Sequence, residues 1–110
     1  MKDYILFDSK GFGDYEYWQD KDRKIVRQIN KLIQSIRRDG VLGGTGKAEV
    51  LSGNYKGCYS RRIDDKNRLI YNVSSDNDVR KTLIVSCREH YPDNVDTKQK
   101  DLLRNLHIYE

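Results

Sequence analysis

The sequence lacks any long apolar run, and this absence excludes one class of protein at the start. A membrane-spanning helix needs about 20 consecutive apolar residues, and no stretch of this 110-residue chain approaches that length. Residues 1–10 have neither the apolar stretch nor the small-residue cleavage site of a signal peptide. We therefore expect a cytoplasmic protein that does not enter a membrane.

Cysteine and histidine are also scarce, with two of each. Cys58 and Cys87 could meet on neighbouring strands, but cytoplasmic thiols usually stay reduced, so two reduced thiols are expected. Adding His90 and His107 gives no zinc pattern, because no pair of these residues has the close spacing of metal ligands. We expect neither a metal nor a cofactor.

The remaining composition is that of one small globular domain with a basic body. Apolar residues make up 36% of the chain and charged residues 35%, and the net charge is +4. From Lys21 to Arg38 there are seven basic residues and a single acid, Asp22. This excess suggests an anionic partner, nucleic acid first, although a solvated helix face would have the same charge.

Periodicity predicts two helices followed by a sheet. Residues 3–7 read as a strand and residues 9–19 as a short helix containing two glycines. Apolar residues then recur at helical spacing, with Asp20 or Asp22 as N-cap and Gly40 as the end: Ile25, Ile29, Leu32, Ile33 and Ile36. Three strands follow, at about 58–63, 68–74 and 82–87, joined by short turns. The predicted fold class is α+β, an antiparallel sheet with two N-terminal helices packed on one face.

Residues 40–48 form a glycine-rich loop that resembles a phosphate-binding loop only superficially. The first glycine of that motif falls on Val41, and the hydroxyl that should follow Lys47 is replaced by Ala48. No strand–helix context surrounds the loop either. We do not expect a nucleotide site there.

Three ionisable side chains near the predicted sheet could together cleave RNA without a metal. Such cleavage needs a base for the 2′-hydroxyl, a fixed cation for the phosphorane and an acid for the leaving 5′-oxygen. Glu49, Arg68 and His90 suit these roles in that order, because arginine meets two phosphate oxygens and histidine titrates near neutrality. Each also has an ordinary structural explanation: a surface ion pair, a solubilising charge on an exposed sheet face, and a structural histidine.

Several segments, in this order and spacing, resemble the YoeB/Txe-type toxins of the RelE superfamily. They are "DYEYWQDKDRKIVRQINKLIQSIRRDG", "GTGKAEVL", "YSRRIDDKNRLIYNV" and "CREHY". The resemblance covers residues 1–91, which we take as the toxin domain. It implies a compact fold similar to the microbial ribonucleases and cleavage of mRNA in the ribosomal A site. It also implies silencing by a YefM-type antitoxin and, as a further assembly, a homodimer.

The resemblance also implies roles for individual residues. It assigns the general base to Glu49, the phosphate-stabilising arginine to Arg68 with Arg62 in support, and the acid to His90. Tyr91 and Lys47 match further site positions. The predicted hairpin leaves the neighbouring arginine open: if Ile63 lies opposite Arg68, then Arg61 faces the site, whereas a one-residue bulge places Arg62 there. Matching to the family favours Arg62, and Arg61 is kept as a candidate for binding phosphate.

The chain also departs from the family pattern. Ala48 and Val50 replace the prolines that usually flank the glutamate, which loosens the loop. Ser52 replaces a basic residue, and Lys56 could take over its contact with RNA. Residues 92–110, where the family usually ends, read as an added short helix with Asp96 and Gln99 as a capping box. This extension is either inert or placed where it covers the site.

Two other classes of function remain open at this point. A non-catalytic RNA- or DNA-binding module explains the charge but gives no reason for Glu49, because a carboxylate weakens phosphate binding. A purely protein-binding domain predicts little dependence on salt, whereas phosphate contacts predict a steep one.

Overall fold

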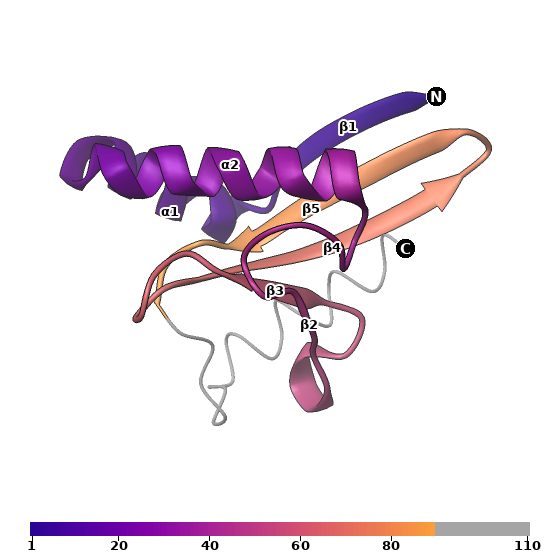
Figure 1. Ribbon diagram of the computed structural model, residues 1–110. Coiled ribbons are helices and arrows are strands. Elements are labelled where there is room, and N and C mark those ends of the chain that lie inside the picture. Colours follow the sequence, from indigo (N-terminus) through magenta and orange to yellow (C-terminus); the bar gives the residue numbers. More distant parts are fainter. Residues whose placement is uncertain (90–110) are drawn as a thin grey trace.

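The computed structural model describes residues 1–89, which form a five-stranded sheet with two helices on one face (Figure 1). The elements in chain order are β1 (Lys2–Phe7), α1 (Ser9–Lys21), α2 (Arg23–Asp39), β2 (Glu49–Val50), a short 3₁₀ turn (Gly53–Tyr55), β3 (Tyr59–Arg62), β4 (Arg68–Asp76) and β5 (Val79–Ser86). This arrangement confirms the predicted α+β class. His90, Tyr91 and the predicted helix of the extension, with Asp96 and Gln99, lie outside the described residues.

Within residues 1–89, neither helix has the length and the apolar character needed to cross a membrane.

The helices begin and end where the sequence supplies caps. Asp22 ends α1 and caps α2, because its carboxylate accepts the backbone N–H groups of Lys24 and Ile25. Gly40 ends α2 with a φ of 92°, a conformation that favours glycine. The apolar face of α2 is buried as its spacing predicts, from Ile25 to Ile36. Helix α2 therefore derives its stability from packing on the sheet.

The strand order is β1-β5-β4-β3-β2, and one pair corrects the sequence-based prediction. β2 to β5 pair antiparallel, but β1 runs parallel to β5, with Ile5 opposite Thr82 and Phe7 opposite Ile84. The sheet is therefore mixed rather than antiparallel. The physical reason is that both helices separate β1 from the later strands, and so long a connection permits a parallel partner.

Apolar side chains pack on both faces of the sheet. The larger cluster lies between the helices and the sheet, around Ile29, Leu32, Leu69, Tyr71 and Ile84. A smaller cluster lies on the opposite face and contains Leu51, Tyr55, Cys58, Ile70 and Val85. Both cysteines are buried and reduced, as expected, and they belong to different clusters.

The two-residue strand β2 was not predicted from the sequence, and it matters for the site. Glu49 pairs with Ser60 and Val50 with Tyr59, so β2 extends the sheet beyond β3. The segment is too short for alternation to be visible in the sequence. As a result, Glu49 belongs to the sheet rather than to the glycine-rich loop.

Candidate active site

Arg62 and Arg68 lie directly opposite each other on β3 and β4. Opposed residues share a face, and so do residues two apart on one strand. Ser60 opposes both Glu49 and Ile70, and Ile70 belongs to the cluster on the face away from the helices. Glu49, Arg62 and Arg68 therefore all lie on the face away from the helices.

Arg68 is held by the turn that precedes it. Its Nη1 donates to the carbonyl oxygens of Asp64 (2.6 Å) and Asn67 (3.1 Å), and its side chain is half-buried. Within residues 1–89 the other guanidinium nitrogens make no hydrogen bond, so they are available to an anion. A guanidinium fixed on one side and unoccupied on the other is suited to binding phosphate.

The turn itself is rigid because Asp64 closes it. The Asp64 carboxylate accepts the backbone N–H groups of Lys66 (2.8 Å) and Asn67 (2.7 Å) and the Asn67 side-chain amide. Burial alone would raise the pKa of Asp64, but these hydrogen bonds and the nearby Arg68 lower it below its ordinary value. The turn thus keeps a carboxylate charged and presents its carbonyl groups to Arg68.

Arg62 is more loosely held than Arg68. It forms an ion pair with Asp65, a side chain that is 86% exposed, and Arg62 itself is 41% exposed. An exposed pair of this kind contributes little, about 0–1 kcal/mol. A phosphate could therefore replace Asp65 at Arg62 at small cost.

Glu49 is exposed on β2, and its side chain makes no hydrogen bond or ion pair with any other described residue. Lys47, two residues before it, is also exposed and has a φ of 51°, in the region that favours glycine. The Arg62 N–H donates to the Gly46 carbonyl at 2.7 Å, which ties this loop to the arginine pair. Lys47 and Glu49 thus approach Arg62 from the neighbouring edge of the sheet.

Lys56 does not lie near this group. It follows the 3₁₀ turn at the closed end of the β2–β3 hairpin, whereas Arg62 is at the open end. The structure therefore does not bring Lys56 together with the arginine pair.

Arg61 is not a candidate for binding phosphate, contrary to the prediction from sequence. Its side chain is fully buried on the helix side of the sheet. The guanidinium donates to the backbone carbonyls of Gly40 (3.0 Å), Val41 (3.3 Å) and Thr45 (2.6 Å). It also contacts Ser35 Oγ (3.2 Å) and Tyr71 Oη (2.9 Å). All five donors of the guanidinium are thereby directed to protein oxygens, and the glycine-rich loop folds around Arg61.

His90 and Tyr91 lie outside the described residues, but Glu89, immediately before His90, lies beside Arg68. The Glu89 carbonyl accepts the Arg68 backbone N–H at 3.1 Å, and the Glu89 N–H donates to Asn67 Oδ1 at 2.6 Å. The end of the described chain is therefore bonded to the same turn that holds the Arg68 guanidinium.

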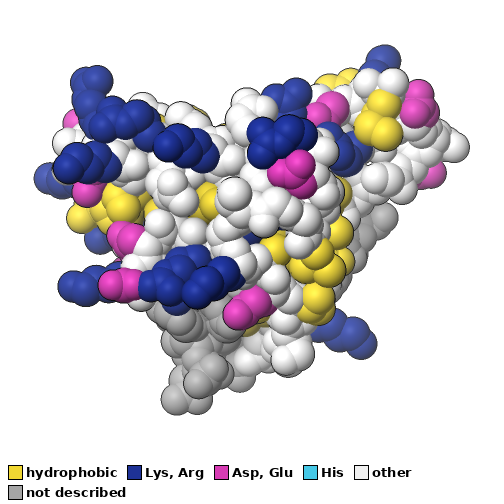
Figure 2. Space-filling model, viewed as in Figure 1, with side chains coloured by type: hydrophobic (Ala, Val, Ile, Leu, Met, Phe, Trp, Pro, Cys, Tyr) yellow, Lys and Arg dark blue, Asp and Glu magenta, His cyan; other side chains and the backbone are white. Residues whose placement is uncertain are grey.

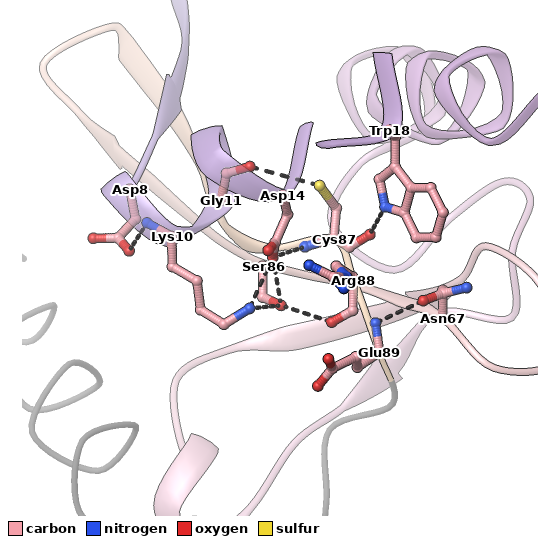
Figure 3. Close-up of polar contacts among 10 residues, drawn as sticks. All are labelled: Asp8, Lys10, Gly11, Asp14, Trp18, Asn67, Ser86, Cys87, Arg88 and Glu89. Carbon is pink, nitrogen blue, oxygen red and sulfur yellow. Dashed lines mark hydrogen bonds and ion pairs between the residues drawn. The ribbon is translucent and has the colours of Figure 1, made fainter. Parts of the chain in front are cut away.

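Helix α1 holds Cys87, two residues before Glu89, by hydrogen bonds to its backbone (Figure 3). The Asp14 carboxylate accepts the Cys87 N–H (3.1 Å) and pairs with Lys10 (2.9 Å), and the Trp18 indole donates to the Cys87 carbonyl (2.8 Å). Burial, with a further contribution from Asp14, raises the pKa of the Cys87 thiol to about 12. Cys87 thus has both backbone groups bonded to α1 and an unreactive side chain.

Asn67, Asp14 and Trp18 were not identified from the sequence. Asp14 and Trp18 are four residues apart and so share one face of α1, which is the only sign the sequence gives of them. Asn67 looked like an ordinary turn residue. In residues 1–89 no group of three His, Cys, Asp or Glu side chains is arranged to hold a metal ion.

Comparison with known proteins identifies the family. The model for "YoeB-like toxin of bacterial type II toxin-antitoxin system" matches residues 7–91. Toxin YoeB of Streptomyces coelicolor is 45% identical over 87 residues, covering 79% of this chain and 98% of that protein. Toxin YoeB of Escherichia coli K12 is 41% identical with the same coverage of both chains.

Solved structures agree with the sequence comparison. The YoeB/ParE toxin from Agrobacterium tumefaciens is 36% identical, with a TM-score of 0.75 over 83% of this chain and all of that one. A chain of the Staphylococcus aureus YoeB–YefM heterotetramer is 47% identical, with a TM-score of 0.69 over 79% of this chain and 95% of that chain. The fold, the site and these relatives together show that the chain belongs to the YoeB-like toxins of bacterial type II toxin–antitoxin systems.

Proposed function

We propose that this toxin is an endoribonuclease that cuts mRNA in the ribosomal A site and thereby stops translation. The observation that carries the proposal is the shared face of Glu49, Arg62 and Arg68, with Glu89 bonded beside them. This arrangement places a carboxylate and two guanidiniums on one surface. A site that served only to bind phosphate would gain nothing from the carboxylate. The action on the ribosome would be cytoplasmic.

Each side chain has one role in the proposed reaction. Glu49 takes the proton from a ribose 2′-hydroxyl, and the 2′-oxygen attacks the adjacent phosphorus. Arg68, with Arg62 in support, stabilises the charge that grows on the phosphorane oxygens. His90 protonates the leaving 5′-oxygen, and Tyr91 orients the phosphate or the base. The products carry a 2′,3′-cyclic phosphate or a 3′-phosphate, together with a 5′-hydroxyl, and no metal takes part.

Geometry supports a central role for Arg68 and a supporting role for Arg62. The Arg68 guanidinium is held by two backbone carbonyls, so it needs little reorganisation when charge develops on the phosphate. Arg62 must first leave Asp65. The glycine-rich loop, folded around Arg61, leads directly into β2 and Glu49.

The relatives supply the proposed protein partners. YoeB of Staphylococcus aureus forms a heterotetramer with YefM, and the dimer of that YoeB is 44% identical to this chain, with a TM-score of 0.73. We propose a YefM-type antitoxin for this toxin as well, and a homodimer. An acidic antitoxin segment would complement the charge of the arginine pair.

Mapping of mRNA 5′ ends after brief induction in cells tests the proposed activity. New 5′-hydroxyl ends inside coding regions should appear with the native toxin and disappear with Glu49→Gln. The matched control is Lys81→Gln, an exposed residue on β5 outside the β3–β4 pairing, which should cut normally. A Glu49→Gln protein that binds RNA more tightly while the native protein leaves mRNA intact would indicate a non-catalytic binding module instead.

A further inference from the structure

Helix α2 carries a row of cations on its solvent face. Arg23, Arg27 and Lys31 are all exposed and follow one another at four-residue spacing, with Lys24 beside the first. Successive members are about 6 Å apart along the helix axis, from the rise per residue. We call these four residues the α2 row. Figure 2 shows Lys and Arg side chains gathered along this helix.

The α2 row has no acidic partners among residues 1–89. Four other arginines are paired with acids: Arg37 and Arg80 with Asp3, Arg38 with Asp39, and Arg62 with Asp65. Among the same residues Arg68 of the candidate site has no acidic partner. No acid interrupts α2 between its N-cap Asp22 and its last residue Asp39, and the Asp22 carboxylate is occupied by backbone N–H groups. The charge of the α2 row is therefore left for an external anion.

The positions of these cations work against the stability of the helix. Like charges four residues apart on a helix repel, and both Arg23–Arg27 and Arg27–Lys31 have this spacing. Arg23 and Lys24 also occupy the first turn, which has no acidic residue and where the helix dipole favours anions. Because the α2 row weakens the helix in two ways, folding does not explain it. A bound polyanion would relieve both effects.

A hollow lies at the start of the α2 row. It has a volume of about 300 Å³ and is lined by Gln19 from the end of α1 and by Arg23, Val26 and Arg27 of α2. Two guanidiniums, an amide and a small apolar surface form its walls. These groups suit a phosphate and the sugar attached to it. A helix face that contacts only water would need no such hollow.

The α2 row and the candidate active site are separate surfaces. Glu49, Arg62 and Arg68 lie on the face of the sheet away from the helices, and α2 covers the other face. Both the basic side chains along α2 and those at the β3–β4 turn are nevertheless visible from one side of the molecule (Figure 2). A large nucleic acid could therefore contact both at once.

We propose that the α2 row is a second RNA-binding surface, which takes the phosphodiester backbone of double-helical RNA. Its regular spacing and its unpaired charge fit a ladder of phosphates and give no base readout. The link to the ribosome rests on the proposed function: folded ribosomal RNA would then be held by the α2 row while single-stranded mRNA occupies the active site.

Binding measurements in a non-cleaving parent test the α2 row alone. In the Glu49→Gln background, Arg27→Gln/Lys31→Gln is compared with Lys2→Gln/Lys81→Gln, which removes two exposed, unpaired charges elsewhere. The probe is a fluorescent RNA hairpin, titrated at several salt concentrations. The α2 variant should bind about tenfold more weakly at moderate salt, with a salt slope reduced by about two, since each phosphate contact contributes close to one. The control should change by less than about twofold.

Two further measurements complete the test: the melting temperature and the binding of single-stranded RNA. The α2 variant should melt slightly higher than its parent because a like-charge pair is removed, so weaker binding cannot be ascribed to a damaged fold. A single-stranded RNA of the same length should be much less affected than the hairpin. Equal losses in the α2 variant and the control, or a loss confined to single-stranded RNA, would overturn the proposal.

The same variants separate this inference from the proposed activity. With native Glu49, Arg68→Gln should slow cleavage by about 10²–10³-fold and leave hairpin binding through the α2 row intact. If the native toxin cuts no RNA but the α2 variant still loses hairpin binding, only the proposed nuclease activity fails.

Discussion

Arg62 and Arg68 lie directly opposite each other on β3 and β4. Arg61, the residue before Arg62, points to the opposite side of the sheet and is buried. The adjacent residues Arg61 and Arg62 therefore have different roles. Arg61 holds the glycine-rich loop to the core, and Arg62 belongs to the exposed pair.

Arg68→Gln should leave the fold unchanged and slow mRNA cleavage by about 10²–10³-fold, as for other fixed donors to a transition-state anion. The effect should fall on kcat rather than on KM, because the guanidinium acts on charge that develops during the reaction. Single-turnover cleavage on programmed ribosomes measures it. Lys81→Gln serves as the control. A variant with native kcat would remove Arg68 from the mechanism.

Arg61→Met should destabilise the protein by about 2–4 kcal/mol, because it leaves the carbonyls of Gly40, Val41 and Thr45 without their donor in a poorly hydrated place. Arg62→Met is the matched control and should change stability by less than about 1 kcal/mol, since its ion pair is exposed. Urea unfolding followed by tryptophan fluorescence compares the two. Equal stabilities would contradict the buried role of Arg61.

The two glycines of α1 should respond in opposite directions to alanine. A Cβ at Gly11 would lie 2.3 Å from the Ile84 carbonyl oxygen, so Gly11→Ala should force α1 away from β5 and cost about 1–3 kcal/mol. A Cβ at Gly13 would meet nothing within 4 Å, and Gly13→Ala should stabilise the helix by about 1 kcal/mol. Thermal melting of the two variants gives the sign of each change. A stabilising Gly11→Ala would show that α1 does not pack this closely.

Acid should weaken the fold through Asp3. Hydrogen bonds from Arg80 and then Arg37 lower the pKa of Asp3 from 3.8 to about 2. A lowered folded-state pKa contributes stability above pH 4, and this contribution is lost as the pH falls from 4 towards 2. It should be on the order of 1 kcal/mol after solvent screening. Asp3→Asn should be less stable than the native protein at pH 6, and the two should converge near pH 2. A constant difference across that range would contradict the assignment.

Periodicity predicted the helices and the β3–β4 hairpin well, because each buries an apolar face. Helix α2 has five isoleucines and leucines at helical spacing and a capping aspartate, so its bounds were found within a few residues. The parallel β1–β5 pair could not be predicted in the same way. Pairing between strands so distant in sequence depends on the whole fold and leaves no local pattern.

The side of the sheet on which Arg61 lies was left open by the sequence for a local reason. Arg61 and Arg62 are the same residue type, so alternation between them carries no information about burial. The signal was two residues away on either side: Tyr59 and Ile63 pack on the helix side, and a residue midway between them must face the same way. Arg61 stayed a candidate because the register of the hairpin was undecided; with Arg62 opposite Arg68, Arg61 lies on the other face.

The parallel pairing of β1 with β5 has a consequence for synthesis of the toxin. Among residues 1–89, the first strand to leave the ribosome pairs only with β5, so this edge of the sheet cannot close until residues 79–86 have been translated. At about 5–20 residues per second, a nascent chain spends seconds in an open form. Each new copy would thus lack a closed sheet until β5 has been made, which leaves time for an antitoxin to be present.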